Sequence, residues 1–482
     1  MTVAPFVPAA VPLIPPDVLE LEDRRPLEAM LDRLRSFAST NADKEQWYEG
    51  TRQIPDLGIS IPPHLRDLET VVGWPGTTVD VLEERLDLED WLSPGADLGL
   101  SEVFRENDLD VLSSLAHLDA LIYGVAFVVV GSGAAGEPDP LVTVESPLSM
   151  TAEFDPRSRR IVSAVSRVAD KDGNTVQATV YRADETVRVE RDRGVWVVVD
   201  RDRHRLGRVP VARLVNRPRT ARMDGRSEIT RAVRSYTQQA VRTLLGMEVN
   251  REFYSSPQRY ALGADPDSFT DRDGNALSSW ETVMGRFLAI GRDEDGNVPE
   301  MGTFASSSPA PYLDQVRGLA QLLAAEAAIP ASYLGFHTEN PSSADAIRQA
   351  EARLVKRAER RQRMFGMAWT EAARLALLVR DGEVPEGFGS VRPLWRDPST
   401  PTRAAAADEA VKLIGSGVFP PDSEVTYERI GLSDTDKQRL IADKRRATAT
   451  ASVSVLAAAA QAARTDPLVA ELADRRGDAS AG

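Results

Sequence analysis

Few of the residue patterns that carry catalytic chemistry occur in this 482-residue sequence. No lysine follows a glycine, so the Gly-Lys-Ser/Thr loop that binds nucleotide phosphates is absent. The sequence also has no Gly-X-Ser-X-Gly nucleophile motif and no cysteine, which excludes thiolate zinc sites, disulfides and cysteine nucleophiles. The four histidines have no metal-ligand spacing; they are His64, His117, His204 and His337. We therefore expect no catalytic residue, no metal and no cofactor.

Acidic residues are too numerous here for a carboxylate pair to indicate catalysis. With 73 Asp and Glu residues, pairs suited to glycoside hydrolysis arise by chance. The run from Asp293 to Asn297 resembles a calcium loop, but its glycine is fourth rather than sixth, which favours a plain hairpin turn. An acidic hydrolase with an unrecognised site remains the enzyme alternative.

The most informative charge feature is a basic run on one predicted helix, in a chain whose formal net charge is −15. Three interpretations stay open: a solvated face with i,i+4 ion pairs such as Glu359–Arg363, pairing with an acidic neighbouring subunit, or DNA contact. We favour the subunit interface, because the acidic total argues against a generally DNA-binding surface. The run has seven cations within sixteen residues: Arg348, Arg353, Lys356, Arg357, Arg360, Arg361 and Arg363.

The composition is that of an ordinary globular protein with several structural units. Hydrophobic residues make up 42% and charged residues 27% of the chain. No stretch approaches the about 18 consecutive apolar residues that a membrane-spanning helix needs. The first 25 residues contain five prolines before residue 17 and lack a basic n-region, so we expect a flexible arm rather than a secretory signal.

Hydrophobic periodicity predicts an α+β fold. Apolar residues at three- and four-residue spacing predict helices at 27–48 and 228–254. Short β-branched runs between turn residues predict about six strands within 122–215. A second helix follows the small insertion at 256–309, and two helices that flank such an insertion can pair antiparallel and push it outward.

Five short strings mark the chain between residues 45 and 435. They are Trp47-Tyr48-Glu49-Gly50, DALIYGVAF at 119–127, GRVPV at 207–211 with Asn216-Arg217-Pro218, FYSSPQRY at 253–260, and IPASYLG at 329–335 followed by PSSADA at 341–346. Their order and spacing resemble those of the portal proteins of tailed double-stranded-DNA bacteriophages, of the type found in phages of actinobacteria. The resemblance implies a portal-like α+β subunit that assembles into a ring of twelve.

The resemblance also implies how the chain divides into regions. It implies a flexible arm at 1–25, a mixed α/β wing at 26–225 with its β unit at about 122–215, a first stem helix at 226–255, a small β clip at 256–309, a second, antiparallel stem helix at 310–330, a channel loop at 331–343, a long wing helix and its return at 344–399, an α-helical crown at 400–475 and a disordered tail at 476–482.

The functional residues implied by the resemblance lie in two segments. The first is a loop that would line the DNA channel, with Glu339, and His337 as a second candidate, facing the lumen. Without the resemblance, a helix–helix connector would be the favoured interpretation of this loop. The channel loop comprises Phe336, His337, Thr338, Glu339 and Asn340, and the stem–clip junction comprises Tyr254, Pro257, Gln258, Arg259 and Tyr260.

The function implied by the resemblance is structural rather than enzymatic. A portal ring occupies one capsid vertex, passes double-stranded DNA without reading its sequence, and docks the terminase large subunit and head-completion or tail proteins. The major capsid protein and a scaffolding protein are further expected partners, no membrane is involved, and assembly would take place in the host cytoplasm. Another ring-forming phage head or connector protein is the alternative within the structural class.

Overall fold

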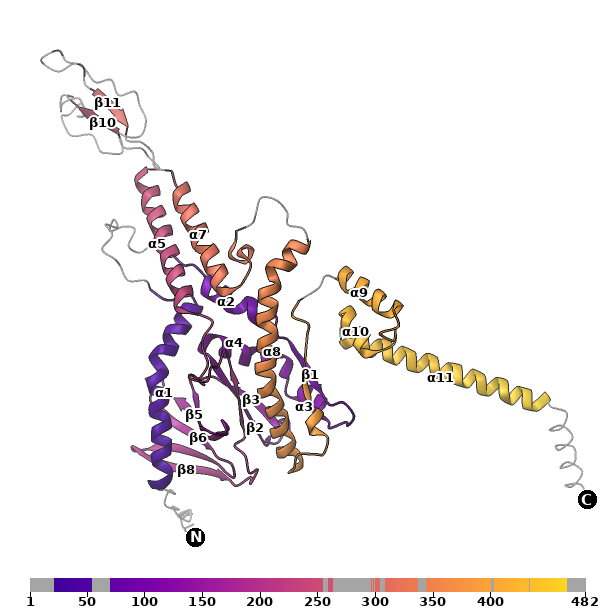
Figure 1. Ribbon diagram of the computed structural model, residues 1–482. Coiled ribbons are helices and arrows are strands. Elements are labelled where there is room, and N and C mark those ends of the chain that lie inside the picture. Colours follow the sequence, from indigo (N-terminus) through magenta and orange to yellow (C-terminus); the bar gives the residue numbers. More distant parts are fainter. Residues whose placement is uncertain are drawn as a thin grey trace, which may run out of the picture. The chain divides into compact units, whose positions relative to one another are not determined.

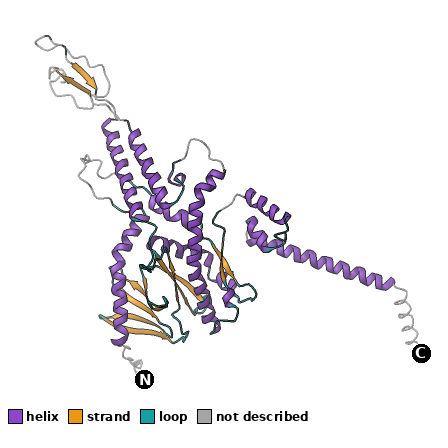
Figure 2. Cartoon of the chain, in the orientation of Figure 1, coloured by secondary structure: helices purple, strands orange, loops and turns teal. Residues whose placement is uncertain are grey.

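The computed structural model describes residues 21–53, 70–254, 259–262, 296, 298, 300–303, 308–336, 344–399, 403–432 and 434–465. The chain divides into two compact units, residues 1–399 and 400–482. Figures 1 and 2 show a mixture of helices and small antiparallel sheets in the first unit and helices alone in the second, so the fold is α+β.

The first helix packs one apolar stripe against a sheet, as its sequence spacing predicts. Helix α1 (Leu21–Tyr48) buries Leu27, Met30, Leu31 and Leu34, which share a core cluster with strand residues such as Val187. These positions recur every three or four residues and therefore fall on one helix face. Phe37, the next apolar residue in the pattern, is 43% exposed.

The two larger antiparallel sheets of the first unit lie within residues 122–215. The strand order is β3-β2-β9 in one sheet and β4-β5-β6-β7-β8 in the other. Residues 122–215 contain eight strands rather than about six. The bounds are β2 Val125–Gly131, β3 Leu141–Glu145, β4 Met150–Phe154, β5 Ile161–Ala169, β6 Thr175–Tyr181, β7 Thr186–Asp192, β8 Val195–Asp202 and β9 Val211–Val215.

Shorter elements complete the base of this unit. Helix α4 carries much of the core, with Leu109, Ala116, Ala120 and Leu121 fully buried. Strand β12, near residue 400, pairs antiparallel with β1 from near residue 90, so the end of the unit lies against a segment some 300 residues earlier. The bounds are α2 Trp74–Glu83, β1 Leu88–Leu92, α3 Leu100–Glu106, α4 Leu109–Tyr123, η4 Phe388–Ser390 and β12 Arg392–Trp395.

Helices α5 (Arg231–Tyr254) and α7 (Ala310–Ala327) lie side by side (Figure 1). Between them in sequence, β10 (Arg259–Leu262) pairs antiparallel with β11 (Glu300–Thr303). In the structure the Thr230 hydroxyl accepts a hydrogen bond from Val233 N at 3.3 Å, so Thr230 is the residue that caps α5.

A 38-residue helix, α8 (Ala344–Asp381), runs along the first unit. Its buried face includes Leu354, Phe365, Trp369 and Leu377, which join the main core. At about 1.5 Å rise per residue, a helix of this length extends over about 57 Å. Helix α8 therefore connects parts of the unit that no shorter element could reach.

The second unit contains only helices among its described residues: α9 (Arg403–Gly415), α10 (Glu424–Ile430) and α11 (Asp434–Thr465). Ala410 and Tyr427 are buried in it, whereas Val453 and Leu456 on α11 are largely exposed. None of the helices that the structure describes is long and apolar enough to cross a membrane.

The connection from β9 to α5 is held by two glycines in close contact. Gly124 ends α4 with φ +106°, and its carbonyl accepts a hydrogen bond from Asn216 N at 2.9 Å. Gly225 has φ +74°, and a Cβ there would lie 2.1 Å from the Gly124 oxygen. No side chain fits into this space, and only glycine adopts such a φ without strain.

We expect Gly225→Ala to destabilise the protein by about 3 kcal/mol or more, because backbone strain and overlap with a carbonyl act together. Gly136→Ala is the matched control. Gly136 also has a positive φ, +96°, but a Cβ there meets nothing within 4 Å, so the strain alone should cost about 1 kcal/mol. Urea unfolding followed by circular dichroism measures both; equal losses would contradict the close contact.

Candidate functional site

The basic run on α8 divides into an exposed set and a buried pair. Arg348, Arg353, Lys356, Arg360 and Arg363 are exposed. Glu359 pairs with Lys356 at 2.8 Å and with Arg363 at 3.6 Å, so the i,i+4 ion pair of the first interpretation is present.

The other two arginines of the run are directed into the protein. The side chains of Arg357 and Arg361 are 16% and 8% exposed, and both form ion pairs with Glu228 of the same chain at 2.5 Å. Sequence analysis favoured a subunit interface for the run and weighed solvent and DNA as alternatives. The structure gives these two residues a fourth role, as intrachain ion pairs, because a buried carboxylate lies within their reach.

Glu228 is the centre of this cluster. Its side chain is 1% exposed, and Arg217 forms a third ion pair with it at 3.3 Å. Asn216 Nδ2 donates to Glu228 Oε1 at 3.0 Å, and Arg361 Nε donates to Asn216 Oδ1 at 3.1 Å. Both carboxylate oxygens are therefore satisfied, which burial of a charge requires.

The cluster joins two neighbouring segments of the chain to a third that is about 130 residues away. Asn216 and Arg217 follow β9, Glu228 precedes α5, and Arg357 and Arg361 lie on α8. Burial alone would raise the pKa of Glu228, but the Arg357, Arg361 and Arg217 guanidiniums outweigh it and hold that pKa below its usual value. Glu228 therefore remains ionised, and its charge fixes α8 against the start of α5.

A second set of contacts joins the two sides of the predicted channel loop. Tyr333 lies in η3 (Ala331–Leu334), just before the loop, and its hydroxyl donates to Glu351 Oε1 on α8, just after the loop, at 2.6 Å. The buried Arg85 donates to the Tyr333 hydroxyl at 3.1 Å and pairs with Glu351 at 3.3 Å. We call Arg85, Tyr333 and Glu351 the loop clamp.

The residues predicted for the channel loop lie mostly outside the described part of the chain. Phe336 is half-buried and packs against the main core. His337, Thr338, Glu339 and Asn340 lie outside the described residues, so their facing toward a lumen stays a prediction.

The stem–clip junction is described only in part. Tyr254 is the last residue of α5. Arg259 and Tyr260 begin β10, opposite Thr303 and Gly302 of β11. Pro257 and Gln258 lie outside the described residues. The structure thus places the junction between a helix end and a two-stranded sheet, and its role stays a prediction.

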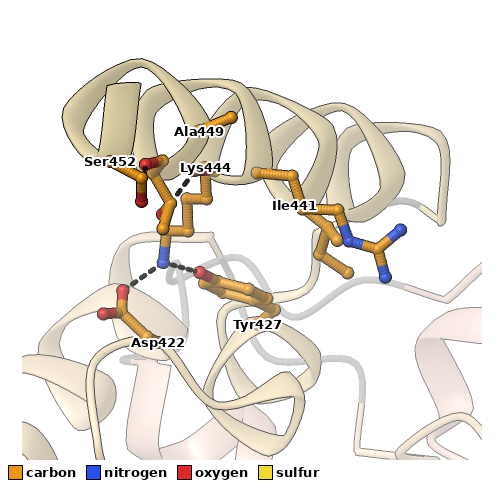
Figure 3. A pocket seen from close by; sticks show the side chains of 8 residues that line it. Asp422, Tyr427, Ile441, Lys444, Ala449 and Ser452 are labelled. Atoms are coloured by element: carbon orange, nitrogen blue, oxygen red, sulfur yellow. Dashed lines mark hydrogen bonds and ion pairs between the residues drawn. The ribbon is translucent and has the colours of Figure 1, made fainter. Parts of the chain in front are cut away.

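A hollow of about 590 Å³ in the second unit, lined from α11 and the segment around α10, is shown in Figure 3. At its base, Lys444 donates hydrogen bonds to an Asp422 carboxylate oxygen and to the Tyr427 hydroxyl. These bonds raise the pKa of Lys444, which keeps the ammonium charged. The lysine therefore fastens α11 to its neighbours, and as a charged ammonium it has no lone pair with which to accept a proton as a catalytic base near neutral pH.

Metal chemistry finds no support in the described part of the chain, where no three His, Cys, Asp or Glu side chains converge as a ligand set. The buried His117 lies in a cluster of aromatic rings, and its Nε2 accepts a hydrogen bond from Trp369 Nε1 at 2.9 Å. Burial lowers the pKa of His117 to about 3, so the ring is neutral and part of the core.

Sequence reasoning missed Glu228, Asn216 and the loop clamp. A signal for Glu228 was present in the charge imbalance around it, because residues 213–234 contain seven arginines and only two acidic residues. A lone glutamate among so many arginines indicates shared pairing. The loop clamp left no such signal, because Arg85 and Tyr333 are separated by 248 residues.

Comparison with known proteins identifies the family to which this chain belongs. The family model for the phage portal protein, SPP1 Gp6-like, matches residues 31–448. The chain therefore belongs to this portal family, which is a structural one.

Two curated relatives make the placement more specific. The chain is 34% identical over 419 residues to the portal protein of Mycobacterium phage L5, covering 83% of this chain and 84% of the relative. It is 35% identical over 405 residues to the portal protein of Mycobacterium phage D29, covering 82% and 83%. Among solved structures, a chain from the neck of a native GTA particle, computed with C12 symmetry, is 13% identical with a TM-score of 0.38, covering 75% of this chain and 91% of that one.

The Glu228 cluster leads to a stability prediction. We expect Glu228→Gln to lower the free energy of unfolding by about 3–5 kcal/mol, because it leaves buried guanidiniums without their counter-charge. Glu359→Gln is the control: Glu359 also pairs with two cations of α8, but at the surface, where a pair contributes about 1 kcal/mol or less. Urea unfolding at neutral pH measures the stability of both variants. Equal losses of unfolding free energy would show that the buried Glu228 cluster stabilises the protein no more than a surface ion pair does.

The loss of stability caused by Glu228→Gln should depend on pH. Because the folded pKa of Glu228 lies below its ordinary value of 4.5, the stabilisation is complete above about pH 4.5 and is lost as the pH falls through the folded pKa. The stability gap between wild type and Glu228→Gln should therefore be constant from pH 7 to about pH 5 and narrow below that. A gap that does not change down to the acid transition would contradict this linkage.

Proposed function

We propose that this chain is one subunit of a dodecameric portal ring at a single capsid vertex, through which double-stranded DNA enters and leaves the phage head. The observation that carries the proposal is the family match over residues 31–448, which includes both β sheets, the α5–α7 pair and α8. The ring order, the passage of DNA and the docking of other proteins are the parts of this proposal that need experiment.

The proposed regions follow the described elements. Residues 26–225 form the wing, α5 and α7 form the stem, and the segment containing β10 and β11 forms the clip. Helix α8 is the long wing helix behind the channel loop, and residues 400–475 form the crown. The side-by-side packing of α5 and α7 supports the stem assignment, because a stem needs two paired helices on either side of the clip (Figure 1).

The loop clamp supports a channel role for residues 336–340. Arg85, Tyr333 and Glu351 hold together the two segments on either side of this loop, so the positions where the chain leaves and rejoins the body are fixed. A loop that touches moving DNA needs such fixed ends, because force on its tip would otherwise displace α8. We place Glu339, and His337 beside it, in the lumen.

Charge supports passage of DNA rather than its retention. Twelve copies of a chain with net charge −15 give a ring of −180 formal charges. Screening limits the range of electrostatic interactions between exposed charges to about 10 Å at 0.1 M salt. Only charges that line the lumen therefore act on DNA directly. A mainly acidic lumen would repel the DNA backbone and keep sliding friction low.

The proposed partners are those of a head vertex. They are the terminase large subunit, which would supply the ATPase that this chain lacks, a head-completion adaptor at the clip, the major capsid protein and a scaffolding protein. The ring would assemble in the host cytoplasm before it becomes part of the virion.

We expect end-on electron micrographs of the purified protein to show rings with a central hole and twelvefold symmetry. Analytical ultracentrifugation should give a mass of about twelve times the 52.6 kDa of one chain. Isolated rings can differ in subunit number from those in a head. Rings of eleven or thirteen subunits would therefore support ring assembly and change only the proposed subunit number. A stable monomer at all protein concentrations and in heads purified from infected cells would overturn the proposal.

A lumen position for Glu339 predicts a charge effect on packaging. In cells infected with phage that lack a functional portal gene, Glu339→Lys supplied in trans should reduce the DNA packaged per head several-fold, because the new cations attract the DNA backbone. Ring assembly should be unchanged. Glu386→Lys, on an exposed loop after α8, is the control with the same charge change. Equal packaging by both variants would remove Glu339 from the DNA path.

A further inference from the structure

A short segment before α5 reverses the charge of the rest of the chain. Residues 213–234 contain seven arginines and two acidic residues, a formal charge of +5. Since the whole chain carries −15, the remaining residues carry −20. A local concentration of one sign in a chain of the opposite sign marks a surface that meets a charged partner.

At the centre of this segment lies a tight hairpin, residues 217–226. Arg219 and Arg222 face each other in an antiparallel bridge, with Arg219 N donating to Arg222 O at 3.0 Å and Arg222 N to Arg219 O at 2.8 Å. Both side chains are exposed, and no carboxylate of the described residues forms an ion pair with either one. Like charges directly opposite one another oppose the pairing that these two backbone hydrogen bonds stabilise.

The charge behind the hairpin adds to the positive field. Lys44 on α1 is buried and donates to Tyr123 O at 2.7 Å and to Asn41 Oδ1 at 3.0 Å. Burial lowers its pKa to about 8, and the nearby Arg222 and Arg234 act in the same direction. An anion bound at the hairpin would relieve this repulsion, because it adds negative charge beside Arg222.

The hairpin is rigidly held. Arg226 N donates to Asn216 O at 2.8 Å, and Asn216 Nδ2 donates to Arg226 O at 2.7 Å, which closes the base of the hairpin. The contact between Gly124 and Gly225 fixes the same base against the start of β2. Arg219 and Arg222 are therefore presented at a set position, so their binding costs less ordering entropy than that of a free arm.

The surface has the chemistry of a phosphate contact and lacks that of a protein interface. Stable protein interfaces centre on buried aromatic or large apolar side chains. None of the large apolar residues exposed in the described chain lies within 213–234, and the tip of the hairpin is Thr220-Ala221. Paired arginine forks instead match the geometry of phosphate oxygens and form charge-assisted hydrogen bonds to them.

We propose that the hairpin at 217–226 binds the phosphate backbone of duplex DNA through Arg219 and Arg222, without reading the base sequence. This inference rests on the proposed function, in which the chain handles DNA, and it assigns to the wing a grip on DNA that is separate from the channel loop.

The test compares three full-length variants with the wild type: Arg219→Ala/Arg222→Ala, Arg219→Lys/Arg222→Lys, and Arg157→Ala/Arg160→Ala. Arg157 and Arg160 are exposed arginines on another turn of the same unit and serve as the control for lost charge. Binding of a fluorescein-labelled 30-base-pair duplex is followed by anisotropy between 50 and 200 mM salt.

We expect the alanine pair at 219 and 222 to weaken DNA binding at least about tenfold at 50 mM salt and to reduce the salt slope by about 1–2. The lysine pair should keep the slope and lose only a few-fold in affinity, which also shows that the hairpin tolerates replacement. The control pair should stay within about twofold of the wild type.

Two outcomes would overturn the inference. The first is an alanine pair that binds DNA with the wild-type affinity and slope. The second is a loss of ring assembly with DNA binding unchanged per chain, which would assign the hairpin to carboxylates of a second copy. Absence of rings from the wild type would count against the proposed function. The anisotropy measurements on unassembled chains would still show whether the hairpin binds DNA.

Discussion

One buried carboxylate determines how the main parts of the first unit are held together. Glu228 lies between the end of the β unit and the start of α5, and its partners Arg357 and Arg361 lie on α8. Because an ionised carboxylate in the interior is tolerable only with its partners in place, α5 and α8 cannot shift independently without large cost. The start of α5 and helix α8 thus share one electrostatic joint.

The constraints around this joint are steric as well as electrostatic. Asn216 bonds both to Glu228 and to Arg361, while Gly124 and Gly225 allow the backbone to pass with no side chain between. Directional hydrogen bonds, paired charges and a glycine contact all act on the same connection. An exposed arginine hairpin can therefore be carried at this point without loosening the body of the protein.

Local patterns in the sequence predicted the long elements and missed the contacts between them. The stripe from Leu27 to Leu34 predicted α1, because helix periodicity is a property of neighbouring residues. Strands β1 and β12 were missed, since Leu88–Leu92 has no clear alternation and its partner is some 300 residues away. The role of Arg357 and Arg361 could not be predicted, because nothing in their own helix reveals a carboxylate 129 or 133 residues earlier.

The loop clamp has a consequence for how this protein can diversify. Arg85, Tyr333 and Glu351 hold the chain on both sides of residues 337–343, and all three lie outside that segment. The contour length between the anchors is set by residue number, at most about 3.6 Å for each residue. Evolution can therefore exchange the chemistry of this segment as a cassette, while insertions or deletions change how far it extends. The side-chain chemistry and the length of this segment can therefore change independently of each other.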